Sequence, residues 1–99
     1  MRRVFYILAS LFLIAGGAWA DDIDHERALE LVREGRIRPL AEVVETVQRD
    51  VPGDMLEVEL ELEEGAYVYE LKILRPKGNV QEVEVDAATG KILTIEDDD

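Results

Sequence analysis

The sequence predicts an α+β domain, in which two short helices precede a four-stranded antiparallel meander and the second helix packs on one sheet face. Two observations carry this prediction. An apolar stripe of helical period begins at Leu40, and at Met55 the apolar period changes from 3.6 to 2. Turn residues separate the alternating segments that follow. Helical segments ahead of a run of strands are typical of helices on one face of an antiparallel sheet.

Capping residues and prolines set the bounds of the two helices. Asp24 is a suitable N-cap for the first helix, and Gly35 is expected to end it. Pro39 fits the first position of the second helix, and Pro52-Gly53 ends that helix. The stripe expected to face the sheet consists of Leu40, Val43, Val44, Val47 and Val51.

The strands follow from alternation. Their apolar positions are Leu56, Val58, Leu60 and Leu62, then Tyr67, Tyr69, Leu71 and Ile73, then Val83 and Val85, and last Leu93 and Ile95. Tyr67 and Tyr69 are expected in the core with their hydroxyl groups at its rim. Between the last two strands, Asp86 to Gly90 form a tight turn, in which Asp86 accepts N–H bonds and Gly90 adopts a positive φ.

The same alternation predicts an acidic sheet face on the side away from the helices. Its candidate binding residues are Glu57, Glu59, Glu61, Glu63, Glu70, Glu82, Glu84 and Asp86, with Lys72 among them. The simplest interpretation is a solvated face that keeps the protein soluble and discourages edge-to-edge aggregation. A docking surface for a basic partner and loose binding of divalent cations are the alternatives.

The first twenty residues resemble a secretory signal peptide. Arg2 and Arg3 form a basic start, Val4 to Ile14 carry no charge, and Ala18-Trp19-Ala20 has the small-x-small pattern of a cleavage site. We therefore expect cleavage after Ala20, a single domain over residues 21–99 with an acidic C-terminal tail, and a periplasmic location. The chain would then contact the membrane only through its signal peptide, before cleavage.

Two other interpretations of this segment are less well supported. An uncleaved anchor would have only residues 4–20 with which to span a bilayer, and two glycines interrupt them. Arg2-Arg3 loosely resembles a twin-arginine signal, but nothing indicates a cofactor loaded before export. The chain has no cysteine, which excludes a lipid-modified lipoprotein and a disulfide scaffold.

Charge restricts the classes of partner. Residues 1–20 hold two arginines and no acidic residue, so their removal takes the net charge from −12 to −14. Such a surface repels phosphate backbones, so nucleic-acid binding is not expected, and it disfavours anionic lipids. A basic protein surface, a cationic peptide or divalent cations would be attracted.

The residue types argue against an enzyme. Residues 21–99 contain no serine or cysteine, and their only histidine is His25, which we expect to be an exposed surface residue. Thr46, Thr89 and Thr94 have no base with which to form a triad. One histidine without cysteines does not make a zinc site. The Asp86–Gly90 turn lacks the spaced ligands of a calcium loop. We expect no catalytic residue and no cofactor.

Two segments resemble the PepSY domain family. They are Val68-Tyr69-Glu70-Leu71 and the turn sequence Val85-Asp86-Ala87-Ala88-Thr89-Gly90-Lys91-Ile92-Leu93, within a likeness that covers about residues 24 to 96. Tyr69, Asp86 and Gly90 correspond to structural motif residues of the family. The resemblance implies a helix-plus-antiparallel-sheet fold, usually outside the cytoplasm.

PepSY domains occur in propeptides of thermolysin-like metallopeptidases and in small secreted proteins, and some stand-alone members accompany sensor kinases. The resemblance therefore implies a non-enzymatic module that binds and regulates another envelope protein with a basic surface, such as a sensor kinase ectodomain or a peptidase. No peptidase sequence follows in this chain, so we expect no inhibition in cis. A cation-binding or cation-sensing protein and a trans-acting peptidase inhibitor are the alternatives, and the oligomeric state stays open.

Overall fold

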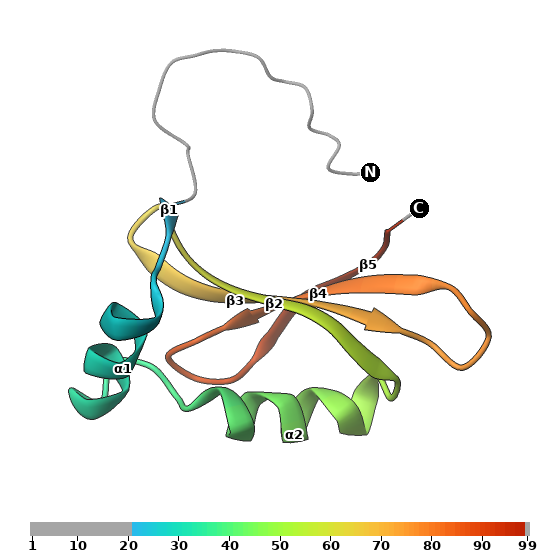
Figure 1. Cartoon of the computed structure of the whole chain (residues 1–99), viewed down its shortest axis with the longest axis horizontal. Coiled ribbons are helices and arrows are strands. Elements are labelled where there is room, and N and C mark those ends of the chain that lie inside the picture. Colours follow the sequence, from blue (N-terminus) through green and yellow to red (C-terminus); the bar gives the residue numbers. More distant parts are fainter. Residues whose placement is uncertain (1–20, 99) are drawn as a thin grey trace, which may run out of the picture.

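The computed structural model describes residues 21–98 of the chain. The elements are, in order, β1 (Asp21–Asp22), α1 (His25–Arg33), α2 (Leu40–Asp50), β2 (Asp54–Glu63), β3 (Ala66–Leu74), β4 (Val80–Asp86) and β5 (Ile92–Asp97). The strands form one antiparallel sheet in the order β1-β2-β3-β4-β5, with the helices on one side of it (Figure 1). The predicted α+β class, two helices followed by an antiparallel meander, is confirmed.

Strand β1 is an addition to the predicted fold. Asp21 and Asp22 pair with Leu62 and Glu61, and the N–H of Ile23 donates to the carbonyl of Leu60 at 2.8 Å. Two residues are too few to show an alternation, so this strand could not be predicted from the pattern of residues. The short strand covers the free edge of β2. The predicted signal peptide, residues 1–20, lies outside the described residues.

Local hydrogen bonds explain where α1 begins and ends. The Asp24 carboxylate accepts the N–H of Arg27 at 2.8 Å, as expected of an N-cap. At the other end, the N–H of Gly35 donates to the carbonyl of Val32 and that of Arg36 to Leu31. Helix α2 starts one residue later than predicted, because Pro39 is its N-cap and Leu40 its first residue.

Helix α2 covers one face of the sheet, as predicted. Val43, Val47 and Val51 are buried and belong to one core cluster with Leu71 and Val83 of the sheet. Burial of these aliphatic side chains is the main stabilising contribution to a domain of this size. Leu40, the first residue of the predicted stripe, is 37% exposed and lines a groove together with Val58 and Leu60 of the sheet.

A β-bulge corrects the predicted pattern of β2. Met55 pairs with Ile73, but the next pair is Glu57 with Lys72, so Leu56 has no partner. The extra residue turns Leu56 into solvent, where it is 54% exposed, and Met55 packs against the core instead. From Glu57 onward the predicted alternation holds.

Strand β5 contains a similar irregularity. Thr94 pairs with Glu84 and Ile92 with Val85, which leaves Leu93 unpaired between them. Leu93 and Ile95 lie in this strand as predicted, yet both are exposed, and Ile92 packs against the core. Which side chain of β5 faces inward depends on its register with β4. The alternation of residues within β5 does not show that register.

The turn that follows β4 ties the helices to the sheet. Asp86 accepts the N–H of Ala88 through its side chain at 3.0 Å and that of Gly90 through its carbonyl at 2.7 Å. Gly90 has φ +82°, a conformation that glycine adopts without strain. The carbonyl of Ala87 accepts the N–H of Arg38, whose own carbonyl accepts the Tyr69 hydroxyl at 2.8 Å. The loop between α1 and α2 is thereby fixed against β3 and β4.

The helices of residues 21–98 are too short and too polar to cross a lipid bilayer.

Candidate binding surface: the acidic face of the sheet

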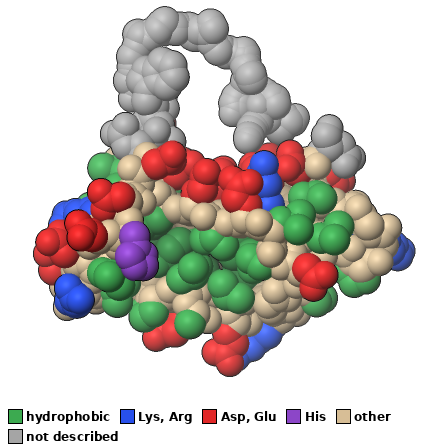
Figure 2. All heavy atoms as spheres, viewed as in Figure 1, with side chains coloured by type: hydrophobic (Ala, Val, Ile, Leu, Met, Phe, Trp, Pro, Cys, Tyr) green, Lys and Arg blue, Asp and Glu red, His purple; other side chains and the backbone are tan. Residues whose placement is uncertain are grey.

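The face of the sheet opposite the helices gathers all eight acidic residues that the sequence proposed. We call it the acidic face, made of Glu57, Glu59, Glu61 and Glu63 on β2, Glu70 on β3, and Glu82, Glu84 and Asp86 on β4. The register places them side by side: Glu70 lies between Glu59 and Glu84. Figure 2 shows acidic side chains along the upper side of the molecule, away from the helices.

Two further acidic residues extend this face. Asp22 of β1 pairs with Glu61, and Glu96 of β5 pairs with Glu82, so carboxylates lie on every strand. Sequence analysis missed Asp22 because a two-residue strand has no period. Glu96 was not among the proposed residues, although its alternation with Ile95 implies this side of the sheet.

Lys72 is the one basic residue that the described part of the sheet presents on this face. Its ammonium lies 3.4 Å from the Asp98 carboxylate and 3.9 Å from that of Glu57. The Asp98 carboxylate, followed by the charge of Glu57, raises the pKa of Lys72. A single ammonium leaves most of the face negative.

Crowding of the carboxylates changes their acidity. Burial raises the pKa of Glu61 to about 8, with further contributions from the hydrogen-bonded Glu63 carboxylate and the charge of Glu70. Burial likewise raises the pKa of Glu70 to about 7, and the charges of Glu82 and Glu84 add to the effect. Both groups therefore hold protons at a higher pH than ordinary glutamates do.

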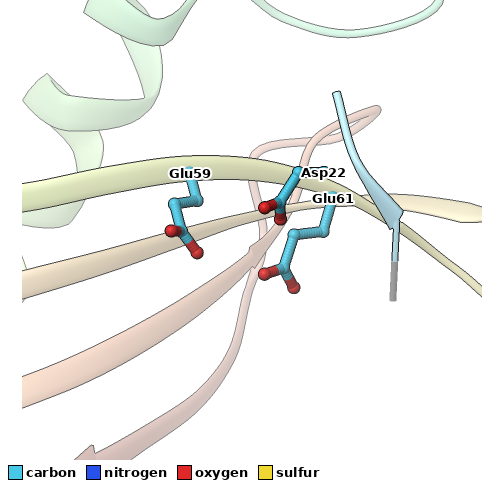
Figure 3. Close-up of side chains that lie close together, drawn as sticks. All are labelled: Asp22, Glu59 and Glu61. Atoms are coloured by element: carbon cyan, nitrogen blue, oxygen red, sulfur yellow. The ribbon is translucent and has the colours of Figure 1, made fainter. Parts of the chain in front are cut away.

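The carboxylates meet most closely in two groups of three. Within each group the ligand oxygens all lie within 4.8 Å of one another; the groups are Asp22, Glu59 and Glu61, and Glu70, Glu82 and Glu84. Figure 3 shows the first group, in which side chains from β1 and β2 extend from the same side of the sheet. Glu82 and Glu84 also take part in other interactions. Such groups can hold protons, bind cations or contact a basic surface.

An apolar groove adjoins the acidic face at the β1 end. It has a volume of about 510 Å³ and lies between α1, the start of α2 and β2, with Leu29 and Leu40 exposed along it. Figure 2 shows it as a hollow of hydrophobic side chains beside the histidine. His25 is exposed at its rim, together with Asp22 and the half-buried Glu59. The sequence did not predict this groove, because its shape depends on the spacing between elements.

The polar side chains that line the groove are those of Asp22, His25, Glu59 and Tyr69. The hydroxyl of Tyr69 donates to the carbonyl of Arg38. The other lining residues are apolar.

Comparison with protein-family models gives one match. The model described as "Peptidase propeptide and YPEB domain" covers residues 39–96, more than half of the chain. The chain belongs to the PepSY family. The PepSY match includes α2, β2, β3, β4 and β5 with Tyr69, Asp86 and Gly90, whereas β1 and α1 precede it. PepSY domains are propeptide or inhibitory-type modules and are generally non-catalytic. Searches of curated proteins and of solved structures found no match.

Proposed function

We propose that this PepSY protein is a non-enzymatic module of the periplasm that binds another envelope protein through its acidic face and regulates it. The observation that carries the proposal is the negative charge of one sheet face. Each of the five strands contributes at least one carboxylate to it. Lys72 is the one basic residue of this face in the described part of the sheet. The location rests on the signal-like residues 1–20, from which Asp21 would be released as the new N-terminus.

Electrostatics favour a basic protein surface as the partner. Like charges that face each other across strands destabilise a sheet by about 0.2–1 kcal/mol for each direct pair, and Glu59, Glu70 and Glu84 form such pairs. A partner that brings lysine or arginine to this face offsets the repulsion and gains in association rate. Binding should therefore weaken with increasing salt.

The family suggests the kind of partner. A sensor kinase ectodomain or a peptidase with a basic surface fits both the regulatory type of module and the charge of the acidic face. The apolar groove beside Asp22 and Glu59 would let the same partner bury an apolar segment at the edge of the contact.

Charge reversal tests the docking surface. The test variant carries Glu63→Lys, Glu70→Lys and Glu82→Lys, and the control carries Glu26→Lys, Glu45→Lys and Asp50→Lys on the exposed sides of the helices. Both variants change the net charge equally. Each full-length chain, with a C-terminal tag, is used to capture partners from native envelope extract, which mass spectrometry identifies.

We expect the wild type and the helix variant to capture the same envelope protein and the acidic-face variant to lose it. Circular dichroism of all three proteins controls for folding. Equal capture by the acidic-face variant would refute docking through this surface.

The propeptide-type family match favours one specific form of this function, inhibition of a peptidase in trans. A panel of thermolysin-like metallopeptidases, assayed with and without the protein, tests it. Inhibition by the wild type and the helix variant, but not by the acidic-face variant, would support it. Full activity of every peptidase in the presence of the wild-type protein would exclude inhibition in trans of the peptidases tested.

A further inference from the structure

The outer edge of β2 is only partly covered by β1. The short strand pairs with Leu62 and Glu61, and the N–H of Ile23 donates to the carbonyl of Leu60 at 2.8 Å. Figure 1 shows the chain leaving the sheet after β1 to enter α1. Within the described part of the chain, no strand pairs with residues 54–59 on this side. This part of the edge is open to another strand.

Val58 directs its backbone toward the open edge. Residues two apart on a strand point their N–H and C=O groups toward the same neighbouring strand. The carbonyl of Leu60 points to β1, because it accepts the N–H of Ile23. The N–H and C=O of Val58 therefore point to the same side, where β1 no longer runs. Such an edge is a template for the backbone of an extended segment.

The apolar groove lies along this edge on the helix side. Val58 and Leu60 line it from β2, and the exposed side chains of Leu29 and Leu40 line it from α1 and α2. Its volume of about 510 Å³ falls within the range of about 300–1,000 Å³ that is usual for ligand pockets. A large apolar side chain from a segment paired with Val58 can be buried there.

The other side of the same edge is acidic. Glu57 and Glu59 flank Val58 in the strand and point to the acidic face. Figure 3 shows Asp22 and Glu59 extending from the same side of the sheet. Lys72 lies 3.9 Å from the Glu57 carboxylate and offsets part of this charge. The edge thus has an apolar side and an acidic side, and the residues of an extended segment alternate between two sides in the same way.

We propose that an extended segment of the partner adds to this edge as a strand antiparallel to β2, with a large apolar residue between two lysines or arginines. The apolar residue pairs with Val58 and places its side chain in the groove. Its two basic neighbours lie opposite Glu57 and Glu59, where unlike charges on facing strands attract. This proposal rests on the proposed docking of a basic partner, for which it names the segment that binds.

The length of the contact follows from the position of Ile23. Every strand pair of this sheet is antiparallel, so the added segment would run in the same direction as β1. Ile23 already occupies the position opposite Leu60. The segment therefore pairs with Glu57, Val58 and Glu59, and the residues on either side of it need no defined side chain.

A synthetic peptide tests the proposal directly. The probe is acetyl-Gly-Lys-Leu-Lys-Gly-amide, titrated into the ¹⁵N-labelled full-length chain with a C-terminal tag and followed by NMR. We expect the largest chemical-shift changes at the amides of Val58, Leu29 and Leu40, and binding that weakens as salt is added. The amide of Val58 should also exchange its hydrogen more slowly with the peptide bound, since it then donates to the peptide.

Two control peptides separate the backbone contact from the charges. N-methylation of the leucine removes the N–H that would donate to the carbonyl of Val58, and should weaken binding at least about tenfold. The isomer acetyl-Lys-Gly-Leu-Gly-Lys-amide has the same composition and charge. Its lysines lie on the leucine's side of the strand, away from Glu57 and Glu59, so it should bind about threefold more weakly or worse.

Matched variants of the protein locate the contact. The groove variant carries Leu29→Gln and Leu40→Gln and should bind the probe at least about fivefold more weakly, because both side chains line the groove. The control carries Leu93→Gln and Ile95→Gln on β5, at the opposite edge of the sheet, and should change the affinity less than about twofold. All four side chains are exposed in the wild type, and circular dichroism checks that both variants fold.

Several results would overturn the proposal. They are no binding of the probe, equal binding of the N-methylated peptide, equal binding by the groove variant, and shift changes confined to β5. Shift changes at Val58 when the protein is concentrated without peptide would identify a second copy of the chain as the occupant, and would overturn it as well.

Peptide binding and partner capture fail separately. The charge-reversal variant at Glu63, Glu70 and Glu82 leaves Glu57 and Glu59 unchanged. Peptide binding at the open edge, together with equal capture by the charge-reversal variant, would refute only docking through the acidic face. Capture that this variant loses, without binding of the probe, would refute only strand addition.

Discussion

The two faces of the sheet are formed by the same strands but have opposite effects on the stability of the fold. On the face toward α2, Leu71, Ile73 and Val83 are completely buried. Next to Leu71 and Val83 on the same strands, Glu70 and Glu82 point to the other side, where Glu70 lies among further carboxylates. The first face stabilises the fold by burial, whereas the second collects like charges that oppose it. The first face supplies the core of the fold, and the second is the surface that we propose binds a partner.

The largest expected effect is on the buried face. Leu71→Ala should lower the free energy of unfolding by about 2–5 kcal/mol, because it removes a fully buried side chain and leaves a cavity. A domain of this size has only about 3–5 kcal/mol from its core, so much of the variant should be unfolded. Urea unfolding followed by circular dichroism measures the change.

Leu93→Ala is the matched control. Leu93 is 49% exposed at the β5 bulge, so the same type of truncation should cost no more than about 0.5 kcal/mol. Equal losses for Leu71 and Leu93 would contradict the assignment of the buried face as the core.

The acidic face should make stability depend on pH in the direction opposite to most proteins. Glu61 has a pKa of about 8 in the fold against 4.5 for the free group, so the folded state binds more protons between these values. The free energy of unfolding should therefore fall as the pH rises from 4.5 to about 8. Glu70, with a pKa of about 7, adds to the same slope below pH 7.

Tm values from pH 5 to pH 8 in EDTA measure this slope. Glu61→Gln removes the titrating group and should flatten it, while Glu57→Gln, for which the structure places the carboxylate beside Lys72, should leave it steep. Stability that rises over this range would contradict the raised pKa values.

A smaller loss of stability is expected from removal of the Tyr69 hydroxyl at the edge of the core. Tyr69→Phe removes the hydroxyl that donates to the carbonyl of Arg38 at 2.8 Å and keeps the buried ring. The loss should be about 1 kcal/mol, the typical contribution of one hydrogen bond. Urea unfolding of the variant and of the wild type measures it. Equal stability of the two proteins would show that the hydroxyl of Tyr69 does not fix the interhelical loop.

The sequence predicted both faces because each residue of a strand alternates sides. From Glu57 onward, the period of two predicted the side of the sheet on which each proposed carboxylate lies. The helical spacing of Val43, Val47 and Val51 predicted the face of α2 that packs on the sheet. These patterns are local to one element, so a single sequence is enough to read them.

Features that depend on two elements escaped prediction. The bulges that expose Leu56 and Leu93 arise from the register with β3 and β4, and the sequence of one strand does not contain that register. Asp22 joins the acidic face only because β1 pairs with β2, and the groove exists only because of the spacing between the helices and β2.

The like charges of the acidic face, which we propose for binding, should lower the stability of the fold. The most direct test is the free energy of unfolding of the full-length chain with Glu59→Gln, Glu63→Gln and Glu70→Gln, measured with urea at about pH 7.5, in low salt and EDTA. Relief of repulsion predicts a variant more stable than the wild type by about 1–2 kcal/mol. A variant less stable than the wild type by a similar amount would show that these carboxylates support the fold, and would contradict the claim.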